Sequence, residues 1–349
     1  MRRSVSAIRF LLFGLGLEAA LATMVAAAAA ADRLPALAAD GNHITVSGLS
    51  SGAYMAVQFA VAHSAQVTGV GVFAGGPYYC VGINPARAES VCMQGSPGAA
   101  GSIRDAERLA GLRLIDSTDH LRGMRAWLLA GESDHTVAEA VVRANAEFFA
   151  HYNKSGTQFR LQPGLGHGLP TATQGVACDT SAPPYINKCG TDAVATMLDA
   201  LQAGSTSAAA GTGRLLTFNQ TEFVAAWRRW GSMSSLSARG YAYIPAACEK
   251  AGAHCRIHIA LHGCHQGDAE IGEVFVRESG YIEWAVAHGT IMLFPQAQPS
   301  SPTLLSWWQP YNPNGCWDWW GYTGTDYSVK TGVQVKAIMA MVDRLAGAR

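Results

Sequence analysis

Apolar and polar positions along the chain form two alternating patterns from Ile44 onward. Short runs rich in Val, Ile and Leu are typical of buried strands, and longer runs with apolar residues three or four apart are typical of helices. We predict strands over residues 44–49, 68–74, 125–130, 159–162, 241–244, 256–261 and 290–295, and helices over residues 52–64, 136–153, 192–203, 222–230, 280–288 and 332–345. This alternation predicts an α/β fold, with a mainly parallel sheet covered by helices on both faces.

A stretch rich in Gly, Ser and Ala over residues 203–213 is the one candidate linker between domains. We interpret it as a surface loop within one domain, because about seven strands divided there would leave two sheets too small to bury helices on both faces. We therefore predict a single domain over residues 32–349.

The N-terminal segment has a different character from the rest. Three arginines precede an apolar run from Phe10, and an alanine tract follows. That order is typical of a secretory signal peptide, which we predict over residues 1–31. The alternative is a membrane anchor, but the run is short for a span and Glu18 interrupts it. We expect an exported protein, extracellular or periplasmic, with no stable membrane insertion.

Composition and charge narrow the range of partners. The chain has 349 residues, of which 49% are hydrophobic and 14% charged, so it can bury a sizeable core. Lys and Arg total 25, as do Asp and Glu, and no stretch is strongly basic. Nucleic-acid-binding proteins carry a basic patch or stripe, so we do not expect nucleic acid as a partner. The oligomeric state stays open.

The eight cysteines all follow the N-terminal segment, and their even number in an exported protein predicts disulfides. Sequence alone does not fix which cysteines pair. The spacing favours three pairs that each flank a short polar or Gly/Pro-bearing loop: Cys80 with Cys92, Cys178 with Cys189, and Cys248 with Cys255. That leaves Cys264 for Cys316. The alternative is a set of free buried thiols, which the N-terminal segment disfavours.

Residues 46–55, VSGLSSGAYM, place three serines around two glycines at the end of a predicted strand. In the G-x-S-x-G motif the serine occupies a sharp turn between a strand and a helix, where side chains on the flanking glycines would collide. Only Ser50 fits, with Gly48 and Gly52 at the right spacing. A bare turn of small residues is the alternative, but the strand before it and the helix after it favour Ser50 as a nucleophile.

A nucleophilic serine needs a base and an orienting acid. Asp134 follows the predicted strand 125–130, so it lies at the sheet edge where the serine turn also lies. Glu132 is the alternative acid. His167 lies in a Gly-rich loop after the next predicted strand, and it is the histidine that follows the acid in this way. We predict His167 as the base.

The predicted strand 256–261 ends in His262, Gly263 and Cys264, which is similar to the oxyanion loop of esterases. In ordinary α/β-hydrolases this loop precedes the serine, whereas here it follows the three candidate residues. Either the similarity is accidental or the chain is circularly permuted. The alternative is metal ligation by His262, Cys264 and His265, which lack a matching cluster of ligands, so we expect no metal and no cofactor.

Taken together, these segments resemble the catalytic domain of the poly(3-hydroxybutyrate) depolymerases, of the circularly permuted single-domain type. The resemblance runs from about Ile44 to Val342 and rests on the segments GLSSGAYMA, GVFAGGPYYC, AGESDHTV, LGHGLPT, IHIALHGCHQ, GYIEWA, LFPQA and NPNGCWDWWGY. It implies a permuted α/β-hydrolase fold. Secreted members often carry an appended polymer-binding domain, but this chain ends at Arg349. We therefore expect the catalytic domain's own surface to hold the polymer.

The resemblance also implies roles for individual residues. It identifies Ser50 as the nucleophile, Asp134 as the acid and His167 as the base. The backbone N–H groups of Ser51 and Cys264 are the implied oxyanion donors.

Five of the nine tryptophans gather near the C-terminal end: Trp307, Trp308, Trp317, Trp319 and Trp320. Proline, asparagine and glycine around them predict a loop, from which ring faces can reach a substrate. Core packing is the alternative for part of the group. The resemblance points to Trp317 as a substrate-binding residue, and a bond between Cys264 and Cys316 would hold it beside the oxyanion loop. A neutral aromatic cleft suits an uncharged polyester or a sugar ester.

We therefore predict a serine esterase that hydrolyses poly(3-hydroxybutyrate) or related polyhydroxyalkanoates, as polymer or oligomer, through an acyl-enzyme. The alternative is a carboxylesterase acting on plant wall esters, such as a feruloyl or acetyl-xylan esterase, with the same triad in a different cleft. A non-catalytic polymer-binding protein that uses the tryptophan loop is a third interpretation of a different class.

Overall fold

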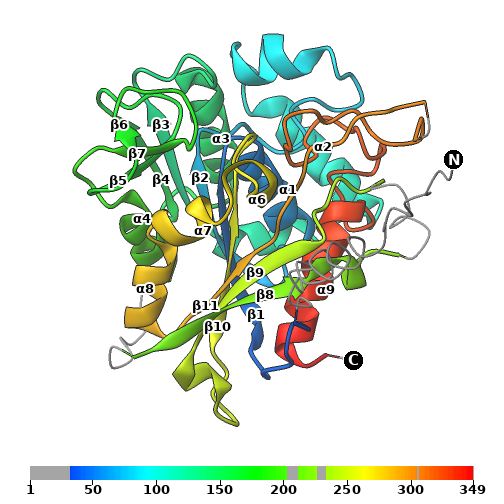
Figure 1. Cartoon of the computed structure of the whole chain (residues 1–349). Helices are drawn as coiled ribbons and strands as arrows, with labels where there is room; N and C mark the ends of the chain where they lie inside the picture. The colour runs from blue at the N-terminus through cyan, green and yellow to red at the C-terminus, as the bar shows by residue number, and fades with distance from the viewer. Residues whose placement is uncertain (1–31, 203–210, 226–232, 305, 349) are drawn as a thin grey trace, which may run out of the picture. The chain divides into compact units, whose positions relative to one another are not determined.

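An eight-stranded sheet runs through the protein in the spatial order β4-β3-β2-β1-β10-β11-β9-β8 (Figure 1). The computed structural model describes residues 32–202, 211–225, 233–304 and 306–348. The strands from β4 to β11 are parallel, and β9 and β8 extend the sheet as antiparallel strands. In spatial order they are β4 (Thr157–Gln162), β3 (Arg125–Gly131), β2 (Val67–Phe73), β1 (Asp40–Leu49), β10 (Arg256–Leu261), β11 (Ile291–Phe294), β9 (Arg239–Pro245) and β8 (Gly213–Asn219).

The first strand of the chain, β1, lies in the interior of the sheet between β2 and β10. Gly48 of β1 pairs with Val72 of β2 on one side and with Leu261 of β10 on the other. The carboxyl ends of β1 and β10 therefore lie level. The loops that follow these two strands, far apart in the sequence, meet at the same edge of the sheet.

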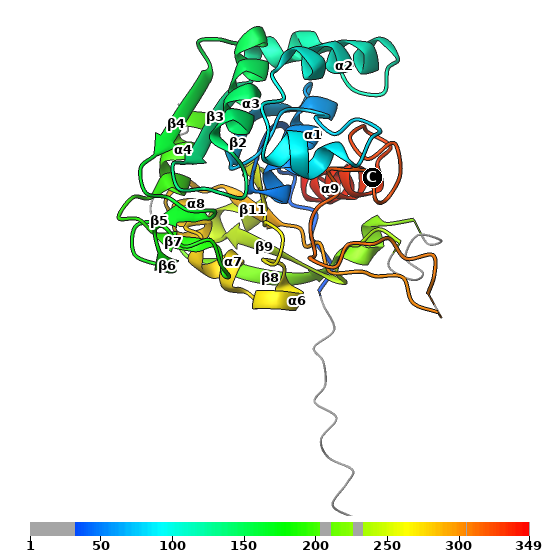
Figure 2. The same ribbon diagram turned by 90° about the horizontal axis from the view of Figure 1, so that it is seen from above.

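Helices cover both faces of the sheet (Figure 2). On one face lie α1 (Ser51–Ala62), α3 (Glu139–Tyr152) and α9 (Val333–Ala346), with α2 (Ala100–Gly111) packed against α3. On the other lie α4 (Ala193–Leu201), α7 (Val274–Glu278) and α8 (Tyr281–His288), near the short α6 (Asp268–Ile271). Every residue of α1 is buried, which explains why its sequence is apolar on all sides.

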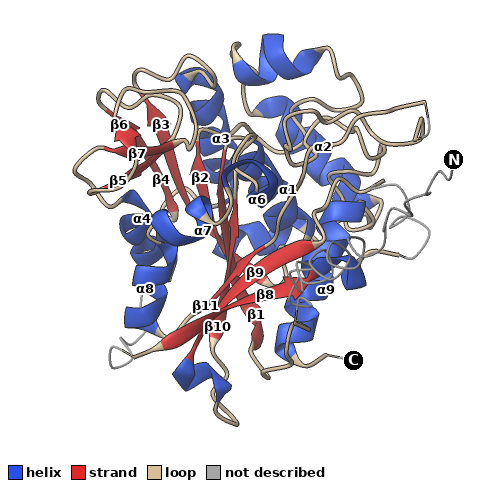
Figure 3. Cartoon of the chain, viewed as in Figure 1, coloured by secondary structure: helices blue, strands red, loops and turns tan. Residues whose placement is uncertain are grey.

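Loops and short elements follow the carboxyl ends of the strands. A three-stranded parallel sheet comes after β4, in the order β5 (Leu169–Thr171), β7 (Ile186–Lys188) and β6 (Val176–Ala177). The described residues between β11 and α9 form loops and turns rather than long elements (Figure 3). Four disulfides join the three pairs favoured by the spacing and the pair that remained: Cys80–Cys92, Cys178–Cys189, Cys248–Cys255 and Cys264–Cys316.

All seven predicted strands are present, but the sequence analysis missed α2, the edge strand β8 and the short elements β5, β6, β7, α6 and α7. The helix predicted over residues 222–230 is wrong where the structure describes it. In place of the start of that helix, a 3-10 turn runs from Gln220 to Phe223, and the backbone of Val224 is extended. The buried side chain of Gln220 bridges the carbonyls of Ser237 and Gln296, each at 2.6 Å, which favours a turn over a helix. Residues 226–230 of that prediction lie outside the described part.

Two other expectations concern segments outside the described ranges. The predicted signal peptide over residues 1–31 is one, and most of the predicted surface loop over residues 203–213 is the other. Residues 32–349 form one compact unit. Within the described ranges, none of the helices combines the length and apolar character needed to cross a membrane.

Candidate active site

Ser50 occupies the sharp turn between β1 and α1. Its backbone has φ 55° and ψ −123°, a conformation that non-glycine residues rarely adopt outside strained functional turns. A Cβ on Gly48 would lie 2.4 Å from the backbone of Gly52, and one on Gly52 would lie 2.3 Å from the carbonyl oxygen of His262. Both flanking positions therefore require glycine, as in a nucleophile elbow.

Asp134 and His167 come together beyond the carboxyl ends of β3 and β4. His167 Nδ1 donates a hydrogen bond to Asp134 Oδ2 at 2.8 Å, and both side chains are buried. Asp134 Oδ1 accepts the backbone N–H groups of Thr136 at 2.8 Å and Val137 at 2.9 Å. These bonds fix the carboxylate and the ring, and they leave His167 Nε2 as the nitrogen able to take a proton.

The alternative acid, Glu132, makes a different contact. Its Oε2 accepts the backbone N–H of Gly164 at 3.2 Å, at the start of the loop that leads to His167. The structure therefore brings Asp134, and not Glu132, to the histidine.

The loop that carries His167 is held from several sides. The His167 backbone N–H donates to Ser181 Oγ at 2.8 Å, and its ring meets the ring of Tyr185 edge-on at 6.1 Å. A Cβ on Gly166 would lie 2.5 Å from the carbonyl oxygen of Asp179, which explains one of the glycines in this loop.

Ser50 Oγ has no hydrogen-bond partner among the described residues. Such bonds are often long in unliganded sites and shorten when substrate binds.

The loop after β10 is held by Gln266, which the sequence analysis missed. Gln266 is fully buried, and its Oε1 accepts the backbone N–H of Gly263 at 2.7 Å. Its Nε2 donates to the carbonyl oxygens of Pro184 at 2.7 Å and Tyr185 at 3.2 Å. One side-chain amide thus ties the loop after β10 to the segment that contacts the His167 ring.

Two backbone N–H groups, those of Ser51 and Cys264, lie where the elbow and this loop meet. Ser51 begins α1, so its N–H has no partner within the helix. Cys264 follows Gly263 and is bonded to Cys316. Within the described ranges, no hydrogen bond uses the N–H of Ser51 or of Cys264. Ser50, Ser51 and Cys264 all line the same pocket.

The residues considered as metal ligands are engaged in other contacts. Cys264 is in a disulfide. His262 is fully buried, with Nδ1 donating to the Gly263 carbonyl at 2.7 Å and Nε2 accepting the Ala297 N–H at 3.0 Å. Burial lowers the pKa of His262 to about 4, so the ring is neutral at ordinary pH. His265 Nδ1 pairs with Glu270 Oε1 at 2.7 Å. These contacts argue against the metal interpretation.

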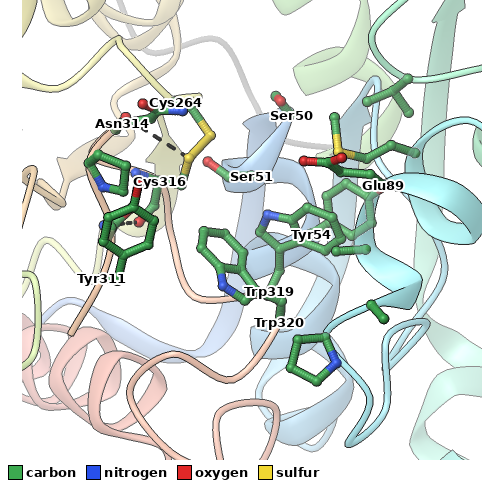
Figure 4. Close-up of a pocket in the computed structure, with 17 residues that line it drawn as sticks. Ser50, Ser51, Tyr54, Glu89, Cys264, Tyr311, Asn314, Cys316, Trp319 and Trp320 are labelled. Carbon is green, nitrogen blue, oxygen red and sulfur yellow. Dashed lines mark hydrogen bonds between the residues drawn. A yellow bond between two sulfur atoms is a disulfide. The ribbon is translucent and has the colours of Figure 1, made fainter. Parts of the chain in front are cut away.

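A pocket of about 550 Å³ opens beside Ser50 (Figure 4). Its walls are mainly apolar and aromatic, and Trp319 stacks on Tyr54 with ring centroids 4.3 Å apart. The pocket is lined by Ser50, Ser51, Tyr54, Pro85, Ala86, Ala88, Glu89, Met93, Val137, Cys264, Tyr311, Asn312, Pro313, Asn314, Cys316, Trp319 and Trp320.

Comparison with known proteins identifies the family. No family model matches the chain. A poly(3-hydroxybutyrate) depolymerase of Delftia acidovorans is 35% identical over 91% of this chain, which spans 62% of that relative's length. A polyhydroxybutyrate depolymerase of Talaromyces funiculosus is 34% identical, with 93% of this chain and 96% of the relative covered. This chain belongs to the polyhydroxybutyrate depolymerases.

Two solved structures of the family support the same assignment. One is the PHB depolymerase of Penicillium funiculosum, and the other is a PHB depolymerase with a serine-to-alanine substitution, complexed with an R3HB trimer. Each has a TM-score of 0.80 and 32% identity, with 91% of this chain and 99% of the other covered. The predicted family and the permuted α/β-hydrolase fold are confirmed.

The structure corrects the position of Trp317 within this depolymerase fold. Trp317 is fully buried, and its ring packs against the ring of His262 with centroids 5.4 Å apart. It does not line the pocket, whereas Trp319 and Trp320 do. The structure therefore does not support the expectation that Trp317 lines the substrate site. The side chain turns into the core beneath the loop after β10, and the next aromatic residues of the loop face the pocket.

Asp318 holds this aromatic loop and was also missed. Its Oδ1 accepts hydrogen bonds from the backbone N–H groups of Gly321 at 2.7 Å and Tyr322 at 3.0 Å, and its Oδ2 accepts one from the backbone N–H of Thr323 at 2.8 Å. Burial raises the pKa of Asp318, and these hydrogen bonds oppose that rise. An aspartate followed by Trp-Trp-Gly-Tyr-Thr was the available signal, because aspartate in a loop often binds nearby backbone N–H groups.

Proposed function

We propose that the protein is a serine esterase that hydrolyses the ester bonds of poly(3-hydroxybutyrate) or related polyhydroxyalkanoates to oligomers and monomers. The observation that carries this proposal is the position of Ser50. It lies at a strained elbow, on the wall of an aromatic pocket, beside two backbone N–H groups that have no partner among the described residues. The membership of the chain in the depolymerase family supports the choice of substrate.

Acylation begins with proton transfer from Ser50 Oγ to His167 Nε2. Oγ attacks the ester carbonyl carbon, and the carbonyl oxygen gains the negative charge. The N–H groups of Ser51 and Cys264 donate hydrogen bonds to that oxygen. Asp134 keeps the ring oriented and stabilises its charged form. The ester C–O bond then breaks, and His167 returns the proton to the leaving alcohol.

Deacylation repeats these steps with water. His167 Nε2 takes a proton from water, and the hydroxide oxygen attacks the acyl carbon. The bond from that carbon to Ser50 Oγ breaks, and His167 returns the proton to the serine. The products are an alcohol-ended and an acid-ended fragment of the chain.

The pocket suits a polyester of short hydroxyacids. The repeat unit carries methyl and methylene groups and no charge, so Tyr54, Trp319 and Trp320 can pack against it without unpaired charges. The alternative of a plant wall esterase is not favoured, because the relatives at 32–35% identity are PHB depolymerases.

The test is hydrolysis of amorphous poly(3-hydroxybutyrate), with analysis of soluble products, by the wild type and by Ser50→Ala. We expect oligomers and monomers from the wild type and a loss of roughly 10⁴-fold or more in the variant. A fluorophosphonate probe should label the wild type at Ser50. Product release by Ser50→Ala above about a tenth of wild type, or no release by the labelled wild type, would overturn the proposal.

We further propose that residues 1–31 are a signal peptide and that the mature protein acts outside the cytoplasm, in the periplasm or the medium. Four disulfides support an oxidising compartment. Mass spectrometry of the protein purified from its natural host should find a mature N-terminus near Asp32. An intact residue 1 in that material would contradict export by cleavage.

A further inference from the structure

Among the described residues that line the pocket, Glu89 is the one that carries a charge. Figure 4 shows its carboxylate turned into the pocket, opposite Cys264 and Tyr311. The carboxylate has no hydrogen-bond or ion-pair partner among the described residues. Glu89 is an exposed residue, so water can solvate its carboxylate in the free enzyme, but the uncharged repeat unit gives the carboxylate nothing to pair with once the polymer is bound.

The backbone around Glu89 is held firmly in place. Glu89 lies on the π-helix η1 (Ala88–Met93), a form of helix often found at functional sites. Cys92 of this helix is bonded to Cys80, and the Tyr54 hydroxyl donates to the Cys92 carbonyl. The Ala138 N–H donates to the Met93 carbonyl at 2.8 Å. These contacts tie η1 to α1 and to the loop that follows Asp134.

We place the acyl side of the ester in the pocket. Its lining includes Ser50, Ser51 and Cys264, but not His167. The leaving alcohol takes its proton from His167, so it must depart on the histidine side. The acyl part of the ester would then bind in the pocket. In a polyester of hydroxyacids, the acyl part of any cleaved ester runs toward the hydroxyl end, and the alcohol part runs toward the carboxyl end.

We propose that Glu89 is a specificity-determining residue that recognises the hydroxyl end of the chain. It accepts a hydrogen bond from the terminal 3-hydroxyl group on the acyl side and repels any negatively charged group there. A hydrogen bond to a charged acceptor is stronger than one to a neutral acceptor, and an unpaired like charge is a means of rejecting a competitor. The inference rests on the proposed function, and it predicts that oligomers are cut preferentially near their hydroxyl ends.

The test compares three tetramers of (R)-3-hydroxybutyrate, each methyl-esterified at the carboxyl end. One has a free hydroxyl end, one an O-acetyl end and one an O-succinyl end, which places a carboxylate on the acyl side. We expect kcat/KM of the wild type to fall roughly tenfold from the free to the acetylated tetramer, and further for the succinylated one. Ratios between substrates are independent of the fraction of folded enzyme.

Three variants complete the design. In Glu89→Gln the preference for acetylated over succinylated tetramer should disappear, and in Glu89→Lys it should reverse. Glu147→Gln is the matched control, because Glu147 is an exposed carboxylate of α3 outside the pocket, and it should keep the wild-type ratios. Equal rates on the three tetramers by the wild type, or wild-type ratios in Glu89→Gln, would overturn the inference. A wild type that cleaves none of the tetramers would instead overturn the proposed function.

Discussion

Gln266 accepts the backbone N–H of Gly263 at 2.7 Å, so that N–H cannot face the pocket. The next N–H of the chain, that of Cys264, is the first one free to do so. The other end of the same side chain is fixed by Pro184 and Tyr185. A single buried amide thus sets the direction of the proposed oxyanion donor.

Gln266→Leu should therefore impair chemistry more than binding. Leucine occupies similar space but makes neither set of hydrogen bonds, so the Cys264 N–H loses its fixed direction. Complete loss of one oxyanion donor costs about 10²- to 10³-fold in kcat, and we expect a loss of roughly tenfold or more here, with KM little changed. Kinetics on p-nitrophenyl butyrate, corrected for active sites with a fluorophosphonate, provide the measurement. A rise in KM at unchanged kcat would contradict the positioning role.

The choice of acid can be tested with a matched pair of carboxylates. Asp134→Asn should lower kcat by about 10⁴, because the histidine loses the partner that orients it and stabilises its charge. Glu132→Gln should have a small effect, since an amide oxygen can still accept the Gly164 N–H. If the Glu132 variant is the more damaged of the two, the acid has been assigned wrongly.

The two neighbouring tryptophans should respond differently to truncation. Trp317→Ala removes a fully buried ring and should destabilise the fold by about 3–5 kcal/mol, lowering the activities on polymer and on p-nitrophenyl butyrate together. Trp319→Ala removes a pocket wall, so oligomer hydrolysis should fall more than hydrolysis of the short ester. Melting temperatures and both activities distinguish these outcomes. A selective loss on oligomers for Trp317→Ala would restore it as a substrate contact.

The disulfide between Cys264 and Cys316 should matter for activity before it matters for the fold. It joins the proposed oxyanion donor to the pocket wall, so replacing both cysteines with serine should lower kcat while the protein stays folded. Replacing both Cys248 and Cys255 is the control, since that disulfide lies outside the pocket. Activity and circular dichroism are measured on both double variants. Equal activity in the two would mean that the Cys264 bridge is only structural.

Stability should fall on acidification below about pH 6.5. Burial lowers the pKa of three histidines from 6.5: His63 to about 4, His258 to about 3 and His262 to about 4. Unfolding restores their ordinary pKa, so between pH 6.5 and 4 the unfolded chain binds more protons than the folded one. The contribution of these neutral rings to the free energy of unfolding is complete above pH 6.5 and is lost as the pH falls through this window. At roughly 1.4 kcal/mol per pKa unit, each ring loses a few kcal/mol.

Melting temperatures between pH 7 and pH 4 provide the measurement. Calorimetry at pH 5 in buffers of different ionisation enthalpy should show proton uptake on unfolding. No uptake, or a melting temperature that stays flat over this range, would contradict the neutral burial of these rings.

Periodicity and motif spacing were sufficient for the main features of the site. Parallel strands carry the residues that follow them to one edge, so the strands predicted where the site lies, and the G-x-S-x-G motif and the family resemblance selected Ser50, Asp134 and His167 there. The direction of a side chain in an irregular loop could not. Whether Trp317 or Trp319 faces the pocket depends on Asp318 and the N–H groups that it binds. Glu89 lies on a π-helix, which has no sequence period that signals it.

The central pairing of β1 with β10 also affects how the protein folds. The hydrogen bond between the side chains of Thr45 and His258 joins residues that are 213 positions apart in the sequence. The two strands that meet there lead to the proposed nucleophile and to the loop of the proposed oxyanion donor. We expect contacts between such distant segments to form late, because closing a long loop costs entropy before any contact offsets it. A half-folded chain holds the serine, the acid and the histidine in its first half but lacks the second half of the site. We therefore expect ester cleavage to begin only when the two halves close on each other.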